Sequence, residues 1–462
     1  MKMVFKAMAL MLCLSLTFLS GCQRQNEQVY HLYTSEPKNM IKNMDSLEEE
    51  TAGGSEQWEV DETQGELEIY SSPLYFDWIV QAFNKKYPNV KVTYNFGSNE
   101  NDNSFSDYTA KTFVDMMSGS AGDVIDIGGM SFQQFGKNNL LEDLYPYIKN
   151  DSEFHKEDYY SNIFEAMKYD NKLWAIPIGF SYYVIRFNKT MLEENQVKAP
   201  EGNSLSYQDI VDVYHKIAPN RDKLLISENG GYQTFERVEY NRYYDEKQGR
   251  AYFDSPDFPK FLNEMKKLQW PSKQELKLAS VRYFWQDYSD RPGENDLCLI
   301  TGSFYYKERN AEVFYKHPSN LTTPIPLSAS NGDKLFYTPD KTLGVLSSSK
   351  NKDLAWKFIR FCIEEKSLET LKNSDTWPLT GMPINRNNTI KLLEDAFREE
   401  DEEAVQSIDK WNSEVNERSF IFAAYALYEP IQEIAEEFFA ERITAEECAR
   451  QMQERAEIYL KE

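Results

Sequence analysis

The chain has 462 residues, more than a single hydrophobic core usually contains, so two lobes are expected. Apolar residues make up 41% of the sequence and aromatic residues 14%, which is ample for packed cores and excludes a disordered protein. The formal net charge of −24 excludes a nucleic-acid-binding protein, because nothing in such a surface could neutralise a row of phosphates.

The first 21 residues are predicted to be a cleaved targeting signal. Lys2 and Lys6 form its basic end, and the apolar run Ala7–Phe18 is too short to span a membrane comfortably as an anchor. The sequence Leu-Ser-Gly-Cys, which ends at Cys22, resembles a bacterial lipobox, whose cysteine is acylated and becomes the mature N-terminus. We therefore expect a palmitate-type lipid anchor at Cys22 that holds the protein on the cell membrane, facing outside the cytoplasm.

Residues 22–64 are predicted to form a flexible acidic tether. From residue 23 onward this segment has ten acidic residues against three basic ones, and such a composition buries too little apolar surface to fold. A flexible coil of this length spans roughly 35 Å on average. The tether would hold a folded body away from the membrane.

After the tether, apolar runs typical of strands alternate with helical patterns. Ser72 stands where it would cap a helix that has Pro73 at its first position. The predicted strands of this region are Leu67–Tyr70, Val90–Tyr94 and Val124–Ile127, and the predicted helices run from Pro73 to Tyr87 and from Tyr108 to Ser118. Strands that alternate with helices form parallel sheets, and ligands bind beyond the carboxyl ends of such strands. The sequence therefore predicts an α/β fold.

The stretch Leu173–Lys189 is predicted to be an interrupted strand. Its apolar run stops at Pro177, which has no N–H for a ladder bond, and an alternating pattern resumes after Gly179. Asn188 then stands where a helix cap is expected. A strand of this kind passes from one sheet into another or forms a bulge within a single sheet, and this stretch alone leaves both interpretations open.

Two later helices have clearly patterned apolar faces. One spans Lys352–Glu365, and the last helix begins with a capping box of Thr444 and Glu447. Beyond the signal and the lipid site, the cysteines are Cys298, Cys362 and Cys448. Their spacing does not suit a metal site. We interpret Cys362 and Cys448 as buried thiols, with one disulfide as the alternative.

The sequence lacks the motifs of the common catalytic sites. It has no G-x-S-x-G elbow, no phosphate loop of the G-x-x-x-x-G-K type and no H-E-x-x-H, and none of its four histidines lies near a cysteine. Asp123 and Asp126 are the kind of carboxylate pair that a glycoside hydrolase uses. In the simpler interpretation, one ends a loop and the other meets backbone donors or a ligand hydroxyl. We expect no enzyme activity, no metal and no cofactor.

Six phrases, in a fixed order over nearly the whole mature chain, resemble extracellular solute-binding proteins of family 1. These are the receptors of ABC importers and include the maltose-binding type. The phrases are Ala82–Tyr94, Asp123–Ile148, Lys172–Pro177, Cys298–Tyr306, Leu343–Glu365 and Thr444–Glu462. The resemblance implies a two-lobed, periplasmic-binding-protein-like fold of type II, in which crossover strands join the lobes around a ligand cleft.

The resemblance also implies where each lobe begins and ends. Crossovers are expected near Pro177–Tyr182, Phe336–Leu343 and Thr376–Ile384. The N-terminal lobe would then contain residues 65–179 plus 338–378. The C-terminal lobe would contain residues 180–337 plus 379–462.

The expected ligand site combines flat aromatic rings with a few fixed polar groups, because a sugar has apolar C–H faces and hydroxyls that need partners. The residues that lie where the family places its site are Ser72, Tyr75, Asp126, Gly129, Met130, Phe180, Tyr182, Phe304, Tyr305 and Trp377. For each aromatic residue among them, the alternative is a side chain of the core. Trp174 and Phe187 are assigned to the core outright.

Together these observations predict a monomeric, lipid-anchored substrate-binding protein that captures a carbohydrate, in particular an oligosaccharide, and delivers it to an ABC permease. A glycan-active hydrolase is one alternative. Another is a sensory receptor that passes its closed state to a membrane kinase. Within the binding class, the excess of acidic residues also permits a polyamine or a metal chelate as ligand.

Overall fold

A computed structural model provides the structure of the chain. It describes residues 58–71, 73–95, 105–128, 130, 132–228, 235, 238–245, 248–270, 295–301, 321–330, 335–369, 379, 381–397, 402–418 and 425–461. The predicted signal, the lipid site Cys22 and most of the predicted tether lie outside these residues. Within the described part of the chain, no helix is long and apolar enough to cross a membrane.

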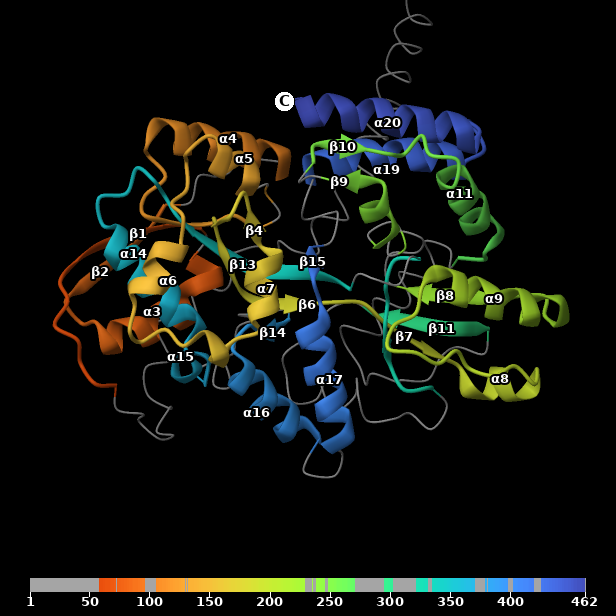
Figure 1. Cartoon of the computed structure of the whole chain (residues 1–462), viewed down its shortest axis with the longest axis horizontal. Coiled ribbons are helices and arrows are strands. Elements are labelled where there is room, and N and C mark those ends of the chain that lie inside the picture. The colour runs from red at the N-terminus through yellow and green to blue at the C-terminus, as the bar shows by residue number, and fades with distance from the viewer. Residues whose placement is uncertain are drawn as a thin grey trace, which may run out of the picture. The chain divides into compact units, whose positions relative to one another are not determined.

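A seven-stranded sheet forms the centre of what we call the first lobe (Figure 1). Its strands lie in the order β14-β6-β13-β3-β1-β2, and β15 pairs with β13. Strand β1 is parallel to both β2 and β3, which confirms the predicted parallel pairing, whereas β13 is antiparallel to β3 and β6. The strands are β1 (Gly65–Tyr70), β2 (Val90–Asn95), β3 (Val124–Asp126), β6 (Ile176–Ser181), β13 (Phe336–Val345), β14 (Met382–Pro383) and β15 (Glu417–Arg418).

Helices surround this sheet, and their aromatic side chains build its core. Phe83 lies 4.5 Å from Tyr87, 5.2 Å from Phe358 and 5.3 Å from Phe361, measured between ring centroids. These contacts join the two helices that the sequence predicts most clearly, one starting at Pro73 and one at Lys352. The helices of this part are α3 (Pro73–Lys86), α4 (Phe105–Ser118), α5 (Phe132–Lys137), α6 (Tyr145–Asn150), α7 (Ser161–Ala166), α14 (Lys352–Ile363) and α15 (Glu365–Glu369).

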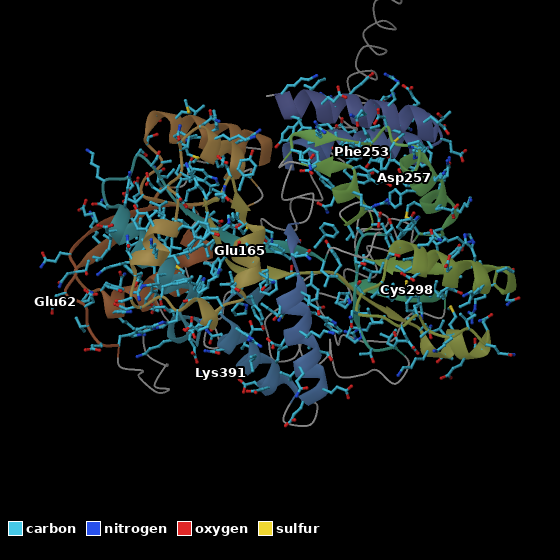
Figure 2. All side chains as sticks on the ribbon, in the orientation of Figure 1. Glu62, Glu165, Phe253, Asp257, Cys298 and Lys391 are labelled. Carbon is cyan, nitrogen blue, oxygen red and sulfur yellow. The ribbon has the colours of Figure 1, made fainter. Side chains whose placement is uncertain are left out.

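A four-stranded sheet in the order β12-β7-β11-β8 forms the centre of the second lobe. Strands β7 and β11 are antiparallel, whereas β11 and β8 are parallel. Cys298 lies on β11 and is fully buried in this lobe's core (Figure 2). The strands are β12 (Ile325–Pro326), β7 (Val184–Phe187), β11 (Asp296–Thr301) and β8 (Leu225–Glu228), and the helices include α8 (Lys189–Glu194), α9 (Tyr207–Ile217) and α11 (Phe258–Lys267).

The C-terminal helices complete the second core. Helices α19 (Tyr425–Phe439) and α20 (Ala445–Lys461) run alongside each other (Figure 1). Thr444 caps α20 by accepting a hydrogen bond from the backbone N–H of Glu447, and Cys448 is fully buried. Cys298, Cys362 and Cys448 are buried, and the structure forms no disulfide among these three residues. Short elements elsewhere are β4 (Lys168–Tyr169), β5 (Lys172–Leu173), β9 (Tyr244–Asp245), β10 (Arg250–Ala251) and the 3₁₀ turns Lys156–Asp158, Ala218–Asn220 and Tyr240–Arg242.

The chain passes from the seven-stranded into the four-stranded sheet along the stretch that the sequence singles out. Strand β6 ends at Ser181 and β7 begins at Val184. The predicted break at Pro177 is wrong, because β6 runs through that residue. Strand β14 pairs only with Gly179 and Phe180, so on that side Pro177 lies beyond the paired residues and its missing N–H is tolerated. The predicted cap at Asn188 is confirmed, since its side chain accepts a hydrogen bond from the Met191 N–H.

Strand β13 connects the two cores in the opposite direction. Phe336, at its start, is buried in the core of the second lobe. Leu343 and Val345, at its end, pair with β3 in the seven-stranded sheet. Strands β14, β6 and β13 are neighbours in that sheet, so segments from all three expected crossovers lie side by side.

The segment that contains α16 (Arg386–Phe397) and α17 (Glu402–Glu414) contacts the first lobe. Asn162 on α7 donates hydrogen bonds to the carbonyl oxygens of Asn412 and Val415. Asn388 on α16 donates to the carbonyl oxygen of Glu365 on α15. Among the residues of 379–418 that the structure describes, none belongs to the buried core of the second lobe. The sequence predicts that all of 379–462 belongs to the C-terminal lobe. From these contacts we propose instead that the chain joins that lobe only beyond residue 418.

The segment that leads into β1 is held to the first lobe by hydrogen bonds and an ion pair. The backbone N–H of Asp61 donates to the Lys86 carbonyl oxygen over 2.8 Å. The Lys357 ammonium lies 3.4 Å from Oδ2 of Asp61 and donates to Thr63 Oγ1 over 2.8 Å. Neighbouring Glu62 lies on the side of this lobe that carries α3 and β2 (Figure 2). The last residues of the predicted tether are thus bonded to α3 and α14.

Candidate functional site

Charged and aromatic side chains meet where β3 ends. Asp126 is the last residue of β3, and its Oδ1 accepts a hydrogen bond of 3.1 Å from the Gly128 N–H. This confirms that Asp126 meets a backbone donor. Tyr75, in the first turn of α3, and Lys341, on β13, approach from two other elements. The site therefore lies beyond the carboxyl end of a parallel strand, where the α/β pattern predicts ligand binding.

The Lys341 ammonium joins the groups of this site, which we call the Lys341 cluster: Tyr75, Asp126, Asp340 and Lys341. Its Nζ lies 3.6 Å from Oδ1 of Asp340 and 4.4 Å from the centroid of the Tyr75 ring. The Lys341 side chain is only 13% exposed. Burial lowers the pKa of this ammonium, but the charges of Asp340 and Asp126 outweigh burial and hold the pKa above its ordinary value. Lys341 thus remains protonated.

The sequence reasoning missed Lys341 and Asp340. Both residues lie within the expected crossover Phe336–Leu343, which the sequence predicts only as a connection between the lobes. The available signal was a pair of adjacent opposite charges inside an apolar strand. Such charges are rarely buried unless they are paired.

Burial raises the pKa of Asp126 to about 6 from an ordinary value of 3.8, against the lowering effect of Lys341. The folded protein therefore binds a proton at Asp126 more tightly than the unfolded chain does. The stability contributed by this proton is complete below pH 4 and is lost as the pH rises through 6.

Asp126→Asn is expected to remove this pH dependence, because asparagine does not titrate. Relative to the variant, the wild-type protein should lose about 2–3 kcal/mol of unfolding free energy between pH 4 and pH 7. Urea unfolding of both proteins at several pH values measures this difference. The exposed Asp254 provides the control variant Asp254→Asn, which should track the wild-type protein. If the unfolding free energies of wild type and Asp126→Asn differ by the same amount at every pH in this range, the pKa of Asp126 is not raised by folding.

Tyr75 supplies an exposed aromatic surface in the cluster. Its side chain is 45% exposed, which is unusual for a large apolar residue of this protein. The Lys341 ammonium lies over the ring, 4.4 Å from its centroid, so the ring is only partly open to solvent. Met130, which was also expected in the site, lies shortly after the end of β3. It is buried, and its backbone N–H donates a hydrogen bond to the Ile127 carbonyl oxygen. An open ring next to fixed carboxylates can stack on an apolar sugar face and accept hydrogen bonds from hydroxyls.

Two other expected ligand residues lie in the core. Phe180 is fully buried, and its ring packs edge-on against Tyr160 at 5.5 Å and Tyr337 at 6.3 Å. Tyr182 is also buried, and burial holds the pKa of its hydroxyl well above the ordinary value. For these two residues the geometry favours the alternative interpretation as core side chains. The core assignments of Trp174 and Phe187 are confirmed.

The remaining expected site residues lie outside the described residues. They are Ser72, Gly129, Phe304, Tyr305 and Trp377. Their assignment to the ligand site stays a prediction, and the second lobe's contribution to the site rests on them.

The carboxylates at β3 are not arranged as a catalytic pair. Oδ1 of Asp123 accepts a 2.6 Å hydrogen bond from the Ser349 hydroxyl, and its Oδ2 accepts one of 3.0 Å from the Glu68 N–H. Asp123 therefore ties three chain segments together inside the lobe. Among the described residues, no group of three or more histidine, cysteine, aspartate or glutamate side chains is placed to hold a metal ion.

Comparison with known proteins identifies the family. The family model described as bacterial extracellular solute-binding protein matches residues 73–369, more than half of the chain. The chain belongs to this family. The match starts at α3 and covers the four-stranded sheet together with β2, β3, β6 and β13 of the seven-stranded sheet. It therefore includes Tyr75, Asp126 and Lys341. Proteins of this family act outside the cytoplasm and bind substrates for ABC permeases; they are binding proteins and not enzymes.

Solved structures of solute-binding proteins share the fold of this one. The sugar-binding protein MalE from Xanthomonas citri superposes with a TM-score of 0.62 at 14% identity, over 86% of this chain and 98% of that one. An ABC substrate-binding protein from Listeria monocytogenes, in complex with cycloalternan, gives a TM-score of 0.60 at 17% identity, over 85% and 98% of the two chains. This solute-binding protein therefore has the two-lobed type II fold of periplasmic binding proteins.

A curated relative is similar in sequence over part of its length. The erythritol/L-threitol-binding protein from Mycolicibacterium smegmatis is 23% identical over 292 residues. The aligned part is 57% of this solute-binding protein and 60% of that relative.

Proposed function

We propose that this solute-binding protein is the lipid-anchored receptor of an ABC importer and captures a carbohydrate, in particular an oligosaccharide, between its two lobes. The Lys341 cluster is the observation that supports this proposal most directly. It offers an open tyrosine ring, two carboxylates and an ammonium at the end of β3. The cluster also borders β13, one of the strands that connect the lobes.

The chemistry of the cluster favours a neutral polyhydroxyl ligand. Asp126 and Asp340 together carry one more negative charge than Lys341 neutralises. An acidic sugar would add a further negative charge to this buried group, whereas hydroxyls donate hydrogen bonds to the carboxylates. Cycloalternan, bound in the Listeria structure, and erythritol and L-threitol, bound by the Mycolicibacterium relative, are neutral polyhydroxyl compounds of very different size. We propose an oligosaccharide and not a small polyol, because stacking on the Tyr75 ring needs the apolar face of a pyranose.

A thermal-shift screen tests the proposed ligand class. The panel contains cycloalternan, maltose, maltotriose, erythritol and L-threitol, with glucuronate and spermidine as acidic and cationic probes. A compound present at a hundredfold excess over its Kd stabilises the folded protein by about 2.7 kcal/mol. We expect a neutral oligosaccharide to give the largest shift. A shift from spermidine alone would replace the proposed ligand class by a polyamine.

The role of Tyr75 is tested with the best compound of this panel. Tyr75→Ala is expected to weaken its binding by about 1–3 kcal/mol, the range found for bases stacked on aromatic rings. Tyr252 is similarly exposed, at 39%, and lies in the second lobe next to β10, so Tyr252→Ala is the matched control. Isothermal titration calorimetry measures both affinities. Equal ligand affinities for Tyr75→Ala and Tyr252→Ala would show that Tyr75 does not contact the ligand.

Binding without turnover separates a receptor from a glycan-active hydrolase. The best compound should be recovered unchanged after prolonged incubation, because Asp123 is engaged in structural hydrogen bonds and offers Asp126 no catalytic partner. Chromatography of the incubated mixture measures this. Products formed at an enzymatic rate would favour the hydrolase. A pull-down from membranes that recovers a kinase and no permease would favour the sensory role.

The lipid anchor is a further part of the proposal and rests on the Leu-Ser-Gly-Cys sequence. Cys22→Ser removes the acylated sulfur, so this variant should be folded and released from the membrane fraction. Immunoblots of membrane and soluble fractions after a carbonate wash measure the release. Retention of the serine variant in the washed membranes would contradict lipidation at Cys22.

A further inference from the structure

Lys341 has an unusual backbone conformation for its position. Its φ is +48°, in the left-handed region that residues with a side chain seldom adopt. The other described non-glycine residues with positive φ are Asn139, Asp170, Asn171, Gln196 and Glu441, and each of these lies in a turn. Among the residues that the structure describes, Lys341 is therefore the one case inside a strand. Such a conformation costs about 1–3 kcal/mol and persists only where the surroundings hold it.

The conformation occurs where β13 changes its partners. Before Lys341, β13 pairs with β15 and with β6, up to Asp340 opposite Gly179. After Lys341, it continues along β6 from Thr342 and also joins β3, beginning with Leu343 opposite Asp126. The same strand starts in the core of the second lobe at Phe336. A change of φ at Lys341 would thus alter the direction in which β13 leaves the first sheet.

The side chain of Lys341 connects this position to the ligand cluster. Its buried ammonium is held by Asp340 at 3.6 Å, by the charge of Asp126 and by the Tyr75 ring at 4.4 Å. These groups come from β13, β3 and α3. The charged groups that act on Asp126 are Lys341 and Asp340, and the backbone groups of Gly128 and Thr342 bond to its carboxylate.

From this arrangement we propose that Lys341 is the positioning residue that couples the ligand cluster to the crossing strand. Its ammonium fixes Asp126 and Tyr75 for the ligand, and the same contacts hold the left-handed backbone of β13. A ligand that engages Asp126 or Tyr75 competes for the ammonium and releases this constraint. The nature of the ligand rests on the proposed function, but the link between cluster and strand does not. A ligand can shift the equilibrium between a constrained and a released β13 only if it makes different contacts in these two states.

The link is tested on the unliganded full chain, so that its outcome is independent of carbohydrate binding. Lys341→Asn removes the charge but tolerates the left-handed conformation, whereas Lys341→Arg keeps the charge. The first readout is the pH titration of the Asp126 carboxyl group by ¹³C NMR. The second is amide hydrogen exchange of residues 336–345, followed by mass spectrometry.

We expect Lys341→Asn to raise the pKa of Asp126 by about one unit or more, because the cation that lowers it is gone. Exchange of the β13 amides should become about tenfold faster, since the constraint on φ is lost. Lys341→Arg should restore both values. Lys352→Asn is the control, because it removes another lysine of the first lobe, which pairs with Glu142 at 2.8 Å. It should change neither readout.

Two results overturn the proposal. One is a Lys341→Asn protein in which the Asp126 titration or the exchange of β13 is unchanged. The other is a Lys341→Arg protein that behaves like Lys341→Asn, since the charge would then be irrelevant. If the asparagine variant does not fold, Lys341→Gly provides the same two readouts, because glycine adopts this φ freely and also lacks the ammonium.

Discussion

Arg360→Ala is expected to lower the free energy of unfolding by about 3–5 kcal/mol, the largest effect that the structure predicts for a single substitution. The Arg360 side chain is 4% exposed, and its guanidinium lies 3.2 Å from Asp151, 2.5 Å from Glu153 and 3.2 Å from Glu364. Alanine would leave the largely buried Asp151 without its cation, and the equally buried Glu364 would keep only Lys86, at 3.4 Å. A buried charge without a partner costs more than the lost ion pair itself.

Urea unfolding monitored by tryptophan fluorescence measures this effect. The control is Arg442→Ala, because Arg442 also pairs with a carboxylate, Glu437, but on the surface of the second lobe. Exposed pairs contribute little to stability, so the control should unfold near the wild-type midpoint. Similar midpoints for both variants would show that the Arg360 network is not a determinant of stability.

Gly381→Ala is expected to destabilise the protein by about 3 kcal/mol, at the upper end of the range for overpacking. A Cβ at position 381 would lie 2.3 Å from the carbonyl oxygen and 2.5 Å from the carbonyl carbon of Phe180. Both atoms belong to the backbone of β6, which is paired on both sides at that residue. The clash cannot be relieved by a side-chain rotation, so the connection between β14 and β6 must open.

Gly249→Ala is the matched control for this substitution. Gly249 has φ +63° and no atom within 4 Å of an added Cβ, so alanine there meets only the left-handed backbone penalty of about 1–2 kcal/mol. Thermal unfolding of both variants separates the two causes. A smaller effect at 381 than at 249 would mean that β14 is easily displaced from β6.

Local sequence signals were sufficient to predict the elements of the first sheet. Strands β1, β2 and β3 and helices α3 and α14 were predicted because apolar periodicity, Pro73 and the surrounding glycines all agree. The strand break was placed at Pro177 and was wrong. Proline prevents pairing only on the side where a neighbour needs its N–H, and the extent of β14 is a tertiary property.

The candidate site was predicted less completely. Tyr75 and Asp126 were predicted because Tyr75 follows β1 and Asp126 ends β3, and the ends of both strands are recognisable from the sequence. Phe180 and Tyr182 were expected in the site but are buried, since the side of a crossing strand that faces the ligand depends on how the sheet neighbours cover it. Lys341 is not predicted because its left-handed backbone has no sequence signature other than glycine, which leaves the adjacent charges of Asp340 and Lys341 as the available signal.

The bonds at Asp61 and Thr63 determine which part of the protein would carry mechanical load. If Cys22 is anchored in the membrane, any pull on the tether reaches the folded body through Lys357 and the end of α3. Both belong to the first lobe. The first lobe would then bear the tension, and the second lobe would be the part that moves when the proposed ligand is captured.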